Sequence, residues 1–363
     1  MAAVSVPECG LEPGLRFACV LDGRGGSVYK SWCEVQAWHP GDGVLWVHLE
    51  RDDPATERWI MEASGVDPVI GEALLIEDSR PRVEGNDDGL LIVLRGISQI
   101  SAGHASHLGG NVDLVPVHLW IDGHRLISLR DKDHQLGALR DIRNANAVGK
   151  GPARPGDLLV QIADKLVKDL EPMLDGMDDE VDQLEDEVLT VAASESRVRI
   201  SDLRRRAIHL RRYLAPQRDA LNRLQREECS WLTDRDKVRL REVIDKVVRY
   251  IEYLDSIRDR AIILHEDLSS ILNERIARTS NRLTGLAALL LPPSLVAGLL
   301  GMNVGGLPGT QDPWGFYIAL IFMAALSVGV VWILRRLHWM YTPTHWVAEK
   351  ACVYSRNGFM LRP

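Results

Sequence analysis

The stretch Leu283–Asn303, LTGLAALLLPPSLVAGLLGMN, decides the architecture of this chain of 363 residues. It contains no Asp, Glu, Lys or Arg, and the charge-free run continues to Gln311. As a helix, Leu283–Leu300 would span about 27 Å, which matches a hydrocarbon core of about 30 Å. The stretch therefore predicts a helix that crosses a membrane.

A second apolar segment, Trp314–Leu334, would span about 31 Å as a helix. Aromatic residues that prefer the membrane–water interface stand near the ends of the two segments: Trp314, Tyr317, Trp332, Trp339 and Tyr341. Taken alone, either segment is also compatible with a buried core helix of a soluble domain. Together with the aromatic residues, the pair predicts transmembrane helices at 283–301 and 314–334.

The positions of Lys and Arg predict the orientation of these helices. Arginines flank the pair on the sides away from the connection: Arg275, Arg278, Arg282, Arg335 and Arg336. The connecting residues 302–313 contain no Lys or Arg. Because loops rich in Lys and Arg stay in the cytoplasm, we expect the connection outside an inner membrane. Both termini, including the basic tail 335–363, are then cytoplasmic.

Residues 1–150 are predicted to form a mixed α/β domain. Short β-rich runs recur there: Leu15–Leu21, Val44–Leu49, Leu90–Ile97, Leu114–Ile121 and Arg125–Leu129. Asp122-Gly123, a preferred pair for a two-residue hairpin turn, separates the last two runs. Helices are expected at Ala55–Ala63 and Gln135–Ala145, and the Gly/Pro-rich stretch Gly149–Gly156 is interpreted as a linker.

Residues 157–282 are highly charged and helix-forming, which predicts three helices: about 157–191, about 196–227, and one that starts near Thr233. Apolar residues in the third follow coiled-coil-like steps of four and three: Leu240, Ile244, Val247, Ile251, Leu254, Ala261, Leu264, Leu268 and Ile271. If this helix continues to Leu300, it is about 100 Å long. A small domain cannot bury so long a rod, so we expect it to pack against copies of itself.

Composition argues against several classes of function. A net charge of −8 disfavours nucleic-acid binding, which needs a basic face. The five cysteines are odd in number and contain no C-x-x-C pair, which indicates neither a disulfide framework nor a zinc finger. No phosphate loop, G-x-S-x-G, H-E-x-x-H or dinucleotide-binding glycine motif stands out. We therefore expect neither an enzyme nor a resident cofactor.

Gly301-Met302-Asn303 stands where the first apolar segment meets the outside, in a Gly-rich, uncharged connection. The Asn303 side chain and the backbone carbonyls at the helix end offer oxygen atoms there. Such oxygens accept hydrogen bonds from the water shell of a divalent cation without holding the ion too tightly for release. The alternative is that Asn and Gly only form a tight turn.

In this position, after a long helix and an α/β domain, Gly301-Met302-Asn303 resembles the signature of the CorA-type divalent cation transporter superfamily. Glu77–Glu84 and Leu91–Gly96 also look like the cytoplasmic domain of that family. Val115–Arg130 and Val304–Gly309 are similar to its zinc-transporting ZntB branch. The Met-Pro-Glu segment usual in the magnesium branch is absent from this loop.

The resemblance implies a homopentameric funnel around a central pore in the bilayer. Each subunit would contribute an α+β cytoplasmic domain, a long helical stalk and two C-terminal transmembrane helices, of which the first lines the pore. Counting back from Asn303 in the family's register gives five candidate pore-lining residues: Ser280, Leu283, Ala287, Leu291 and Ser294. Rings such as Leu291 can gate a pore by dewetting, although each of these residues is equally compatible with packing between helices.

Histidines and carboxylates bear on which metal is carried, because zinc prefers imidazole, thiolate and carboxylate ligands. His104 and His107 would chelate at i, i+3 in a local helix. His265, Glu266 and Asp267 would form a ring of five copies, and the family register brings Glu266 near the pore entrance. The alternative for all of them is an ordinary structural role, which is also the interpretation of three other histidines: His118, His124 and His209.

Glu171–Glu187 carries nine acids and no base, and Arg197–Arg226 is rich in arginine. A carboxylate cluster raises the local cation concentration and would draw ions from the pore. The favoured alternative is a pair of complementary helix faces joined by solvated ion pairs.

These inferences predict a ZntB-like importer of Zn²⁺ in the inner membrane that uses no ATP. Coupling to a proton gradient is implied by the resemblance only, since no Asp, Glu, Lys, Arg or His lies in either apolar segment. One alternative is a magnesium, cobalt or nickel channel of the same superfamily, driven by the membrane potential. An alternative of another class is a non-conducting, membrane-anchored coiled-coil scaffold or sensor.

Overall fold

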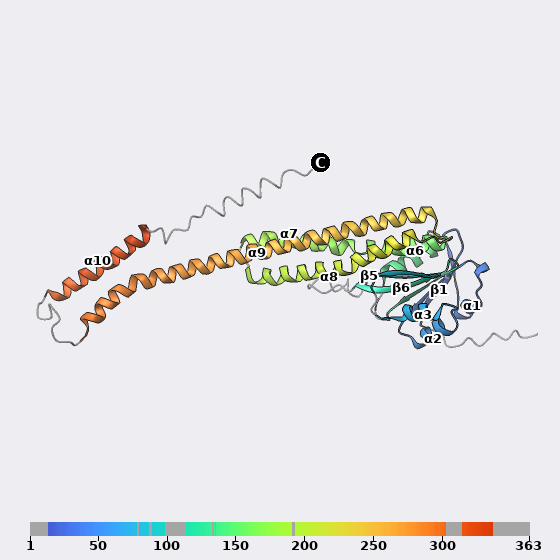
Figure 1. Cartoon of the computed structure of the whole chain (residues 1–363), viewed down its shortest axis with the longest axis horizontal. Coiled ribbons are helices and arrows are strands. Elements are labelled where there is room, and N and C mark those ends of the chain that lie inside the picture. Colours follow the sequence, from blue (N-terminus) through green and yellow to red (C-terminus); the bar gives the residue numbers. More distant parts are fainter. Residues whose placement is uncertain are drawn as a thin grey trace, which may run out of the picture. The chain divides into compact units, whose positions relative to one another are not determined.

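The computed structural model describes residues 14–77, 80–86, 89–98, 114–132, 134, 136–190, 193–302 and 314–336 (Figure 1). Backbone contacts divide the chain into two units, Met1–Glu266 and Asp267–Pro363. The boundary falls inside α9 (Asp234–Leu300), the longest helix of the described chain.

Within the described residues, a seven-stranded mixed sheet forms the centre of the first unit. Its strands are β1 (Leu15–Leu21), β2 (Ser27–Tyr29), β3 (Val44–Glu50), β4 (Arg82–Asn86), β5 (Gly89–Ile97), β6 (Leu114–Ile121) and β7 (Arg125–Arg130). Their spatial order is β2-β1-β3-β7-β6-β5-β4, in which β3 and β7 run parallel and the other neighbours antiparallel. The five strands expected from the sequence are confirmed to within one residue, and the two edge strands β2 and β4 are additional.

The hairpin between β6 and β7 forms at the predicted Asp122-Gly123 pair. Gly123 has a φ of +89°, which a residue without Cβ adopts at little cost. The Asp122 Oδ1 atom accepts the main-chain N–H groups of His124 (3.0 Å) and Arg125 (2.9 Å). Local side-chain hydrogen bonding therefore sets this turn.

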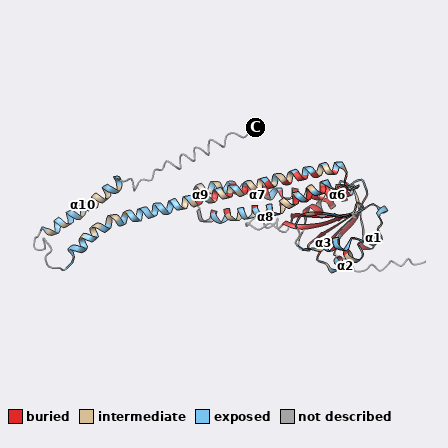
Figure 2. Cartoon of the chain, in the orientation of Figure 1, coloured by how far each residue is buried: buried red, intermediate tan, exposed pale blue. Residues whose placement is uncertain are grey.

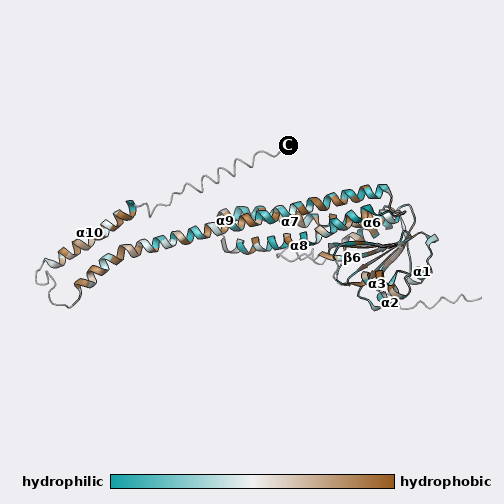
Figure 3. Cartoon of the chain, viewed as in Figure 1, coloured by the Kyte–Doolittle hydropathy of each residue, from teal (hydrophilic) through white to brown (hydrophobic). Residues whose placement is uncertain are grey.

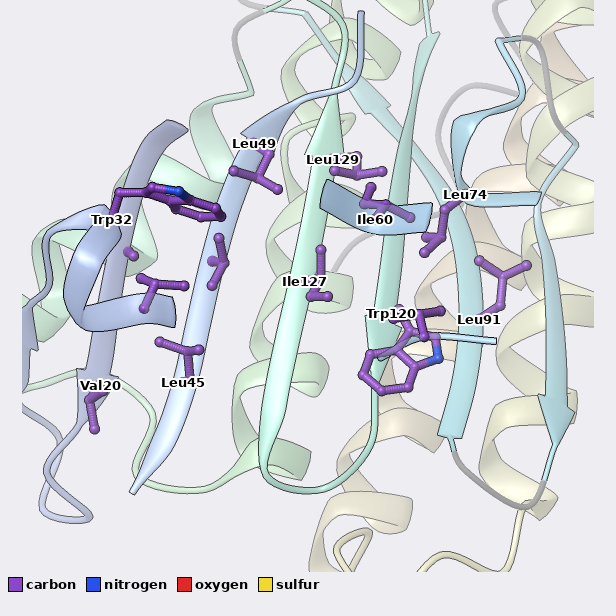
Figure 4. Packing of buried hydrophobic residues seen from close by; sticks show 14 of the residues in the cluster. Val20, Trp32, Leu45, Leu49, Ile60, Leu74, Leu91, Trp120, Ile127 and Leu129 are labelled. Carbon is purple, nitrogen blue, oxygen red and sulfur yellow. The ribbon is translucent and has the colours of Figure 1, made fainter. Parts of the chain in front are cut away.

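Three short helices pack against one face of the sheet: α1 (Trp32–Gln36), α2 (Pro54–Glu62) and α3 (Pro68–Leu75). Figure 4 shows Trp32, Ile60 and Leu74 from these helices in one apolar layer with the strand residues Leu49 and Trp120. These five side chains are at most 2% exposed. Their burial removes a large apolar area from water and forms the core of this face.

Both α2 and α3 begin at an Asp-Pro pair. A side-chain oxygen of Asp53 accepts the N–H of Ala55 (2.7 Å), and one of Asp67 accepts the N–H of Val69 (2.8 Å). The prolines that follow have a φ angle suited to the first helical turn and no N–H group to leave unpaired.

The opposite face of the sheet is covered by α6 (Pro155–Lys168), which α5 (Gly137–Ala147) contacts. Side chains alternate along β5, so Gly96 faces away from the layer that contains Leu91 and Val93. A Cβ atom on Gly96 would lie 2.4 Å from Leu166 Cδ2 of α6. Glycine at this position therefore lets α6 approach the sheet closely.

The helical part of the first unit contains α7 (Glu171–Thr190), α8 (Ala193–Arg226) and α9 as far as Glu266. The second unit contains the rest of α9 and α10 (Gly315–Arg336). The expected helices at about 196–227 and from near Thr233 to Leu300 are confirmed. The expectation of one helix over about 157–191 is wrong, because α6 ends at Lys168 and α7 starts at Glu171. Pro172 cannot supply an N–H group to a helix interior, but it fits the first turn of a new helix.

The described cysteines differ in their bonding. Cys33 of α1 is disulfide-bonded, whereas Cys19 and Cys229 are free thiols. Spacing along a sequence does not report which cysteines a fold brings together.

Candidate cation-conduction site

The C-terminal part of α9 and all of α10 form an apolar and exposed surface in the single chain (Figures 2 and 3). Both helices are long and apolar enough to cross a membrane, and their apolar segments are not buried. Leu283 is 63% exposed and Leu291 is 66% exposed. Apolar surface of this extent is suited to lipid or to other subunits rather than to water.

The five candidate pore-lining residues lie on one stripe of α9. Steps of three or four residues separate Ser280, Leu283, Ala287, Leu291 and Ser294, so their side chains share a helix face. All five are exposed in the single chain. The structure therefore places them together, as a narrow stripe with a hydroxyl group at each end and apolar groups between.

Hydroxyl groups on this helix donate to its own backbone. Ser294 Oγ donates to the carbonyl oxygen of Leu290 (2.7 Å), and Thr284 Oγ1 donates to that of Ser280 (2.9 Å). A hydroxyl that uses its one proton in this way keeps lone pairs on its oxygen as acceptors. Such an oxygen can accept a hydrogen bond from the water shell of a cation.

Pro292 and Pro293 lie inside α9, which continues through them as a helix. Because proline has no N–H group, the carbonyl oxygens of Ala288 and Leu289 lack the amide donor that a helix normally places four residues later. Beside Leu291 and Ser294, the backbone of α9 therefore makes fewer internal hydrogen bonds than an ordinary helix. Membrane helices tolerate this where neighbouring helices or water satisfy the carbonyls.

Gly301 ends this helix. Its N–H donates to the carbonyl oxygen of Ala297 (2.9 Å), and a Cβ atom at Gly301 would lie 3.1 Å from that same oxygen. Met302 follows as an exposed residue. Asn303, the third residue of the motif, lies outside the described residues.

Aromatic residues mark both ends of α10 as predicted. The rings of Trp314 and Tyr317 have centroids 6.0 Å apart at its start. At its end, the Arg336 guanidinium lies 5.1 Å from the centroid of the Trp332 ring. A cation stacked on an indole ring suits the membrane–water interface, where one group is apolar and the other remains hydrated. Trp339 and Tyr341 lie outside the described residues.

The candidate metal ligands do not converge within one chain. His265, Glu266 and Asp267 are consecutive on α9, so their side chains point about 100° apart around the helix. In the part of the chain that the structure describes, no group of three or more His, Cys, Asp or Glu side chains is arranged to hold a metal ion. A site at these residues requires further copies of the chain. His104 and His107 lie outside the described residues.

The acidic helix α7 is ion-paired with arginines of its neighbours. Arg260 of α9 donates to three of its carboxylates: Asp178 (3.0 Å), Asp182 (2.5 Å) and Glu185 (2.8 Å). On α8, Arg199 pairs with Glu187 (2.7 Å) and Arg206 with Glu180. For these five carboxylates the interpretation as complementary, ion-paired helix faces is confirmed, and the five carboxylates share three guanidinium groups.

The buried histidines are structural. His118 of β6 is fully buried, as expected of a packing residue, and burial lowers its pKa to about 3. The sequence did not single out His48 of β3. Both faces of this strand are buried, so the alternation of apolar and polar residues that marks a half-exposed strand does not show that its histidine is buried. Burial likewise lowers its pKa to about 3, and its Nδ1 lies 2.9 Å from Ser128 Oγ.

Comparisons with known proteins agree with this architecture. The model of the family described as CorA-like Mg²⁺ transporter protein matches residues 41–336. The divalent cation transporter CmaX of Pseudomonas aeruginosa is 34% identical over 337 residues, which cover 92% of this chain and 99% of CmaX. The zinc transport protein ZntB of Pectobacterium carotovorum is 31% identical over 330 residues, covering 90% of this chain and 96% of ZntB.

Solved structures show the same fold. Full-length CmaX matches with a TM-score of 0.75 and 33% identity, covering 92% of this chain and all of CmaX. The CorA magnesium transporter of Methanocaldococcus jannaschii matches with a TM-score of 0.74, over 89% of this chain and 98% of that one; at 20% identity this likeness concerns the fold alone. The chain therefore belongs to the CorA superfamily of divalent cation transporters, near its CmaX and ZntB members, and not to a family of enzymes.

Proposed function

We propose that this protein carries Zn²⁺ into the cytoplasm across the inner membrane, through a pore that five copies of the chain surround. The observation that carries the proposal is the exposed stripe from Ser280 to Ser294 on α9, which ends at Gly301-Met302. Similarity to ZntB proteins over 90% of the chain supports zinc as the substrate.

In this pore, the first transmembrane helix lines the conduit and α10 faces lipid. The hydroxyl oxygens of Ser280 and Ser294 accept hydrogen bonds from the cation's water shell, while five Leu291 side chains form a ring that opens and closes by wetting and dewetting. Asn303 adds a ring of amide oxygens at the outer mouth. Both termini lie in the cytoplasm, because the arginines flank the spans on that side.

The transport uses no ATP and is coupled to the proton gradient. The spans contain no Asp, Glu, Lys, Arg or His, so a relay of ionisable side chains within the bilayer does not carry the protons. The protons cross the membrane with the water of the conduit and then protonate groups in the cytoplasmic part of the protein.

Purified protein in liposomes tests the proposal, with a zinc-sensitive and a pH-sensitive dye inside. We expect zinc uptake with acidification of the lumen, and near-complete loss of uptake in Asn303→Ala. Asn281→Ala, the same substitution at an exposed α9 residue off the stripe, serves as control and retains uptake. Zinc uptake without acidification would remove the coupling, and equal fluxes of wild type and Asn303→Ala would favour a non-conducting scaffold or sensor.

A magnesium, cobalt or nickel channel of the same superfamily is the second candidate. The matching family model, described as a Mg²⁺ transporter, favours it. This candidate predicts that Mg²⁺ uptake exceeds Zn²⁺ uptake, rises with an inside-negative potential and does not depend on a pH gradient. That result would favour it over zinc–proton symport.

A further inference from the structure

Two rows of opposite charge run along α8 and α9 in the first unit. The arginine row on α8 repeats every seven residues: Arg197, Arg204, Arg211 and Arg218. The carboxylate row on α9 has the same repeat: Asp245, Glu252, Asp259 and Glu266. Seven residues are close to two helical turns, so each row stays near one face, with about 10.5 Å between members and a drift of about 20° per repeat. Arg218 is half-exposed, and the other seven residues are exposed.

The members of the two rows lie at matching heights along the helix axes, which we call level with each other. Two contacts set the antiparallel register of α8 and α9: Arg211 Nε lies 2.7 Å from Asp255 Oδ1, and Gln225 Nε2 donates to the carbonyl oxygen of Lys237 (3.2 Å). In this register Arg204 is level with Asp259 to within about one helical turn. Because both rows have a seven-residue repeat, the other members are level in the same way.

Within one chain, the carboxylate row is not the face that α9 turns to its neighbours. Other residues of α9 make those contacts: Lys246 pairs with Asp164 of α6 (2.6 Å), and Arg260 pairs with Asp178 of α7 (3.0 Å). The apolar seam of α9 is buried in this part of the helix: Leu240, Val247 and Leu254. The carboxylate row therefore lies on the side of α9 that this chain leaves uncovered.

Most charges of the two rows make no salt bridge with another described residue of the chain. Among the described residues, Asp245, Glu252 and Glu266 make no salt bridge, and neither do Arg197 and Arg204. The remaining members have only local or same-chain partners: Asp259 pairs with the adjacent Arg258 (2.9 Å), Arg218 with the adjacent Asp219 (2.8 Å), and Arg211 with Asp255.

From this arrangement we infer that the arginine row of one copy docks against the carboxylate row of the next copy in the assembly. The inference rests on the proposed pore, in which copies are related by rotation about an axis along α9. Such a rotation keeps every residue at its level, and a ring needs two different, complementary surfaces on each subunit. Two level-matched rows of opposite sign meet that requirement.

A second copy of this chain is the occupant that fits, because the chain itself carries both complementary surfaces. Contact of either row with its own equivalent would bring like charges together, which is unfavourable. The docking also gives the carboxylate row a role in assembly, since carboxylates held by guanidinium groups are not open to cations.

Charge reversal on the full-length protein tests the inference. Arg197→Glu with Arg204→Glu raises the protein concentration at half-dissociation of the oligomer by about tenfold at low salt, and high salt reduces the difference. Adding Asp259→Arg with Glu266→Arg restores assembly. The matched control reverses Arg226 and Arg235, exposed arginines outside the row, and leaves assembly unchanged. Light scattering of the detergent-solubilised protein measures the mass, and failure of the second pair to restore assembly would overturn the inference.

Cross-linking tests which copies meet. Two differently tagged chains are expressed together, one with Arg204→Cys and the other with Asp259→Cys, and oxidation links the two tags in one band. Each single variant alone, and the pair of Arg226→Cys with Asp259→Cys, gives no such band. An intact oligomer without the cross-link overturns the docking.

The outcomes separate this inference from the proposed function. If the oligomer conducts cations, stays intact after charge reversal and forms no cross-link, the docking is contradicted and the transport function stands. If charge reversal weakens assembly and the second pair restores it, but the protein carries neither zinc nor magnesium, the docking stands and the transport function is contradicted. A monomer removes both.

Discussion

The main-chain N–H of Arg95, in β5, donates a 2.8 Å hydrogen bond to Oε1 of Gln217, in α8. Both residues are buried. The edge strand β4 begins at Arg82, which pairs with Val93, so the N–H of Arg95 lies past the end of its neighbour strand. The Arg95 guanidinium also lies 4.0 Å from the centroid of the Tyr213 ring. At this edge α8 takes the place of a strand and covers backbone groups that would otherwise lack a partner.

Gln217→Ala is expected to lower the free energy of unfolding by about 1–3 kcal/mol, because the Arg95 N–H is then buried without an acceptor. Thermal unfolding of the purified protein, followed by circular dichroism, measures the change. Gln183→Ala, at an exposed position of α7, is the control and should change stability by less than about 0.5 kcal/mol. Equal effects of the two substitutions would contradict the role of Gln217.

Gly123→Ala is expected to cost more than Gly23→Ala. Both glycines have positive φ angles, +89° and +74°, so each substitution carries a backbone penalty of about 1 kcal/mol. A Cβ atom at Gly123 would also lie 2.6 Å from Trp231 Cδ1, whereas one at Gly23 meets nothing within 4 Å. Thermal unfolding of both variants measures the difference. In a double-mutant cycle, Trp231→Ala should relieve the extra cost; strict additivity would show that the clash does not matter.

Arg260→Gln is expected to destabilise the helical part by about 1–3 kcal/mol. It removes the one guanidinium that Asp178, Asp182 and Glu185 share, and these carboxylates then repel one another. Because salt screens that repulsion, the loss should shrink as NaCl is raised in thermal unfolding experiments. Arg249→Gln, at an exposed position of α9, provides the control. A loss that does not depend on salt would indicate packing rather than charge.

His48→Gln is expected to flatten the dependence of stability on pH. Burial lowers the pKa of His48 from 6.5 to about 3, so the folded state holds it neutral while the unfolded state binds a proton. Its contribution is therefore complete above about pH 6.5 and is lost as pH falls toward 3, by up to about 1.4 kcal/mol per pH unit. Unfolding temperatures between pH 7 and pH 4 measure the slope, and the exposed His124→Gln should leave it unchanged.

If the proposed pore forms, Leu291→Ser is expected to raise cation leak through it, because a ring of hydroxyl groups stays wet where a ring of leucines excludes water. Leu299→Ser is the matched control: Leu299 is 51% exposed, against 66% for Leu291, and five residues separate it from Ser294, so it lies off the stripe. Liposome flux at zero potential measures both variants. A larger leak in Leu299→Ser than in Leu291→Ser would place the pore on another face of α9.

Much of the fold could be predicted because its signals are local. Strands β5, β6 and β7 are rich in apolar and β-branched residues, and Asp122-Gly123 marks the turn between the last two. The edge strands β2 and β4 were missed because they are short and their sequences, such as Arg82–Asn86, have no apolar run. The break between α6 and α7 was missed because helix-forming residues continue across it.

The candidate site also has a part that the sequence predicts and a part that it does not. The residues from Ser280 to Ser294 were chosen by the register of the family that the sequence resembles, and helix periodicity then places them on one face. The pairing of Asp178 and Asp182 with Arg260 was not predictable residue by residue, because these side chains are separated by about eighty positions and meet only when α7 packs on α9.

By itself, then, the sequence determined where the chain is apolar enough to enter a membrane, which segments become helices or strands, and which residues share a helix face. These properties depend on neighbours within a few turns or a single strand. Only the tertiary structure decided the strand order, the use of Gln217 as a substitute strand partner, and which carboxylates remain unpaired on α9. Each of these depends on contacts between residues far apart in the chain, and chain folding alone brings such residues together.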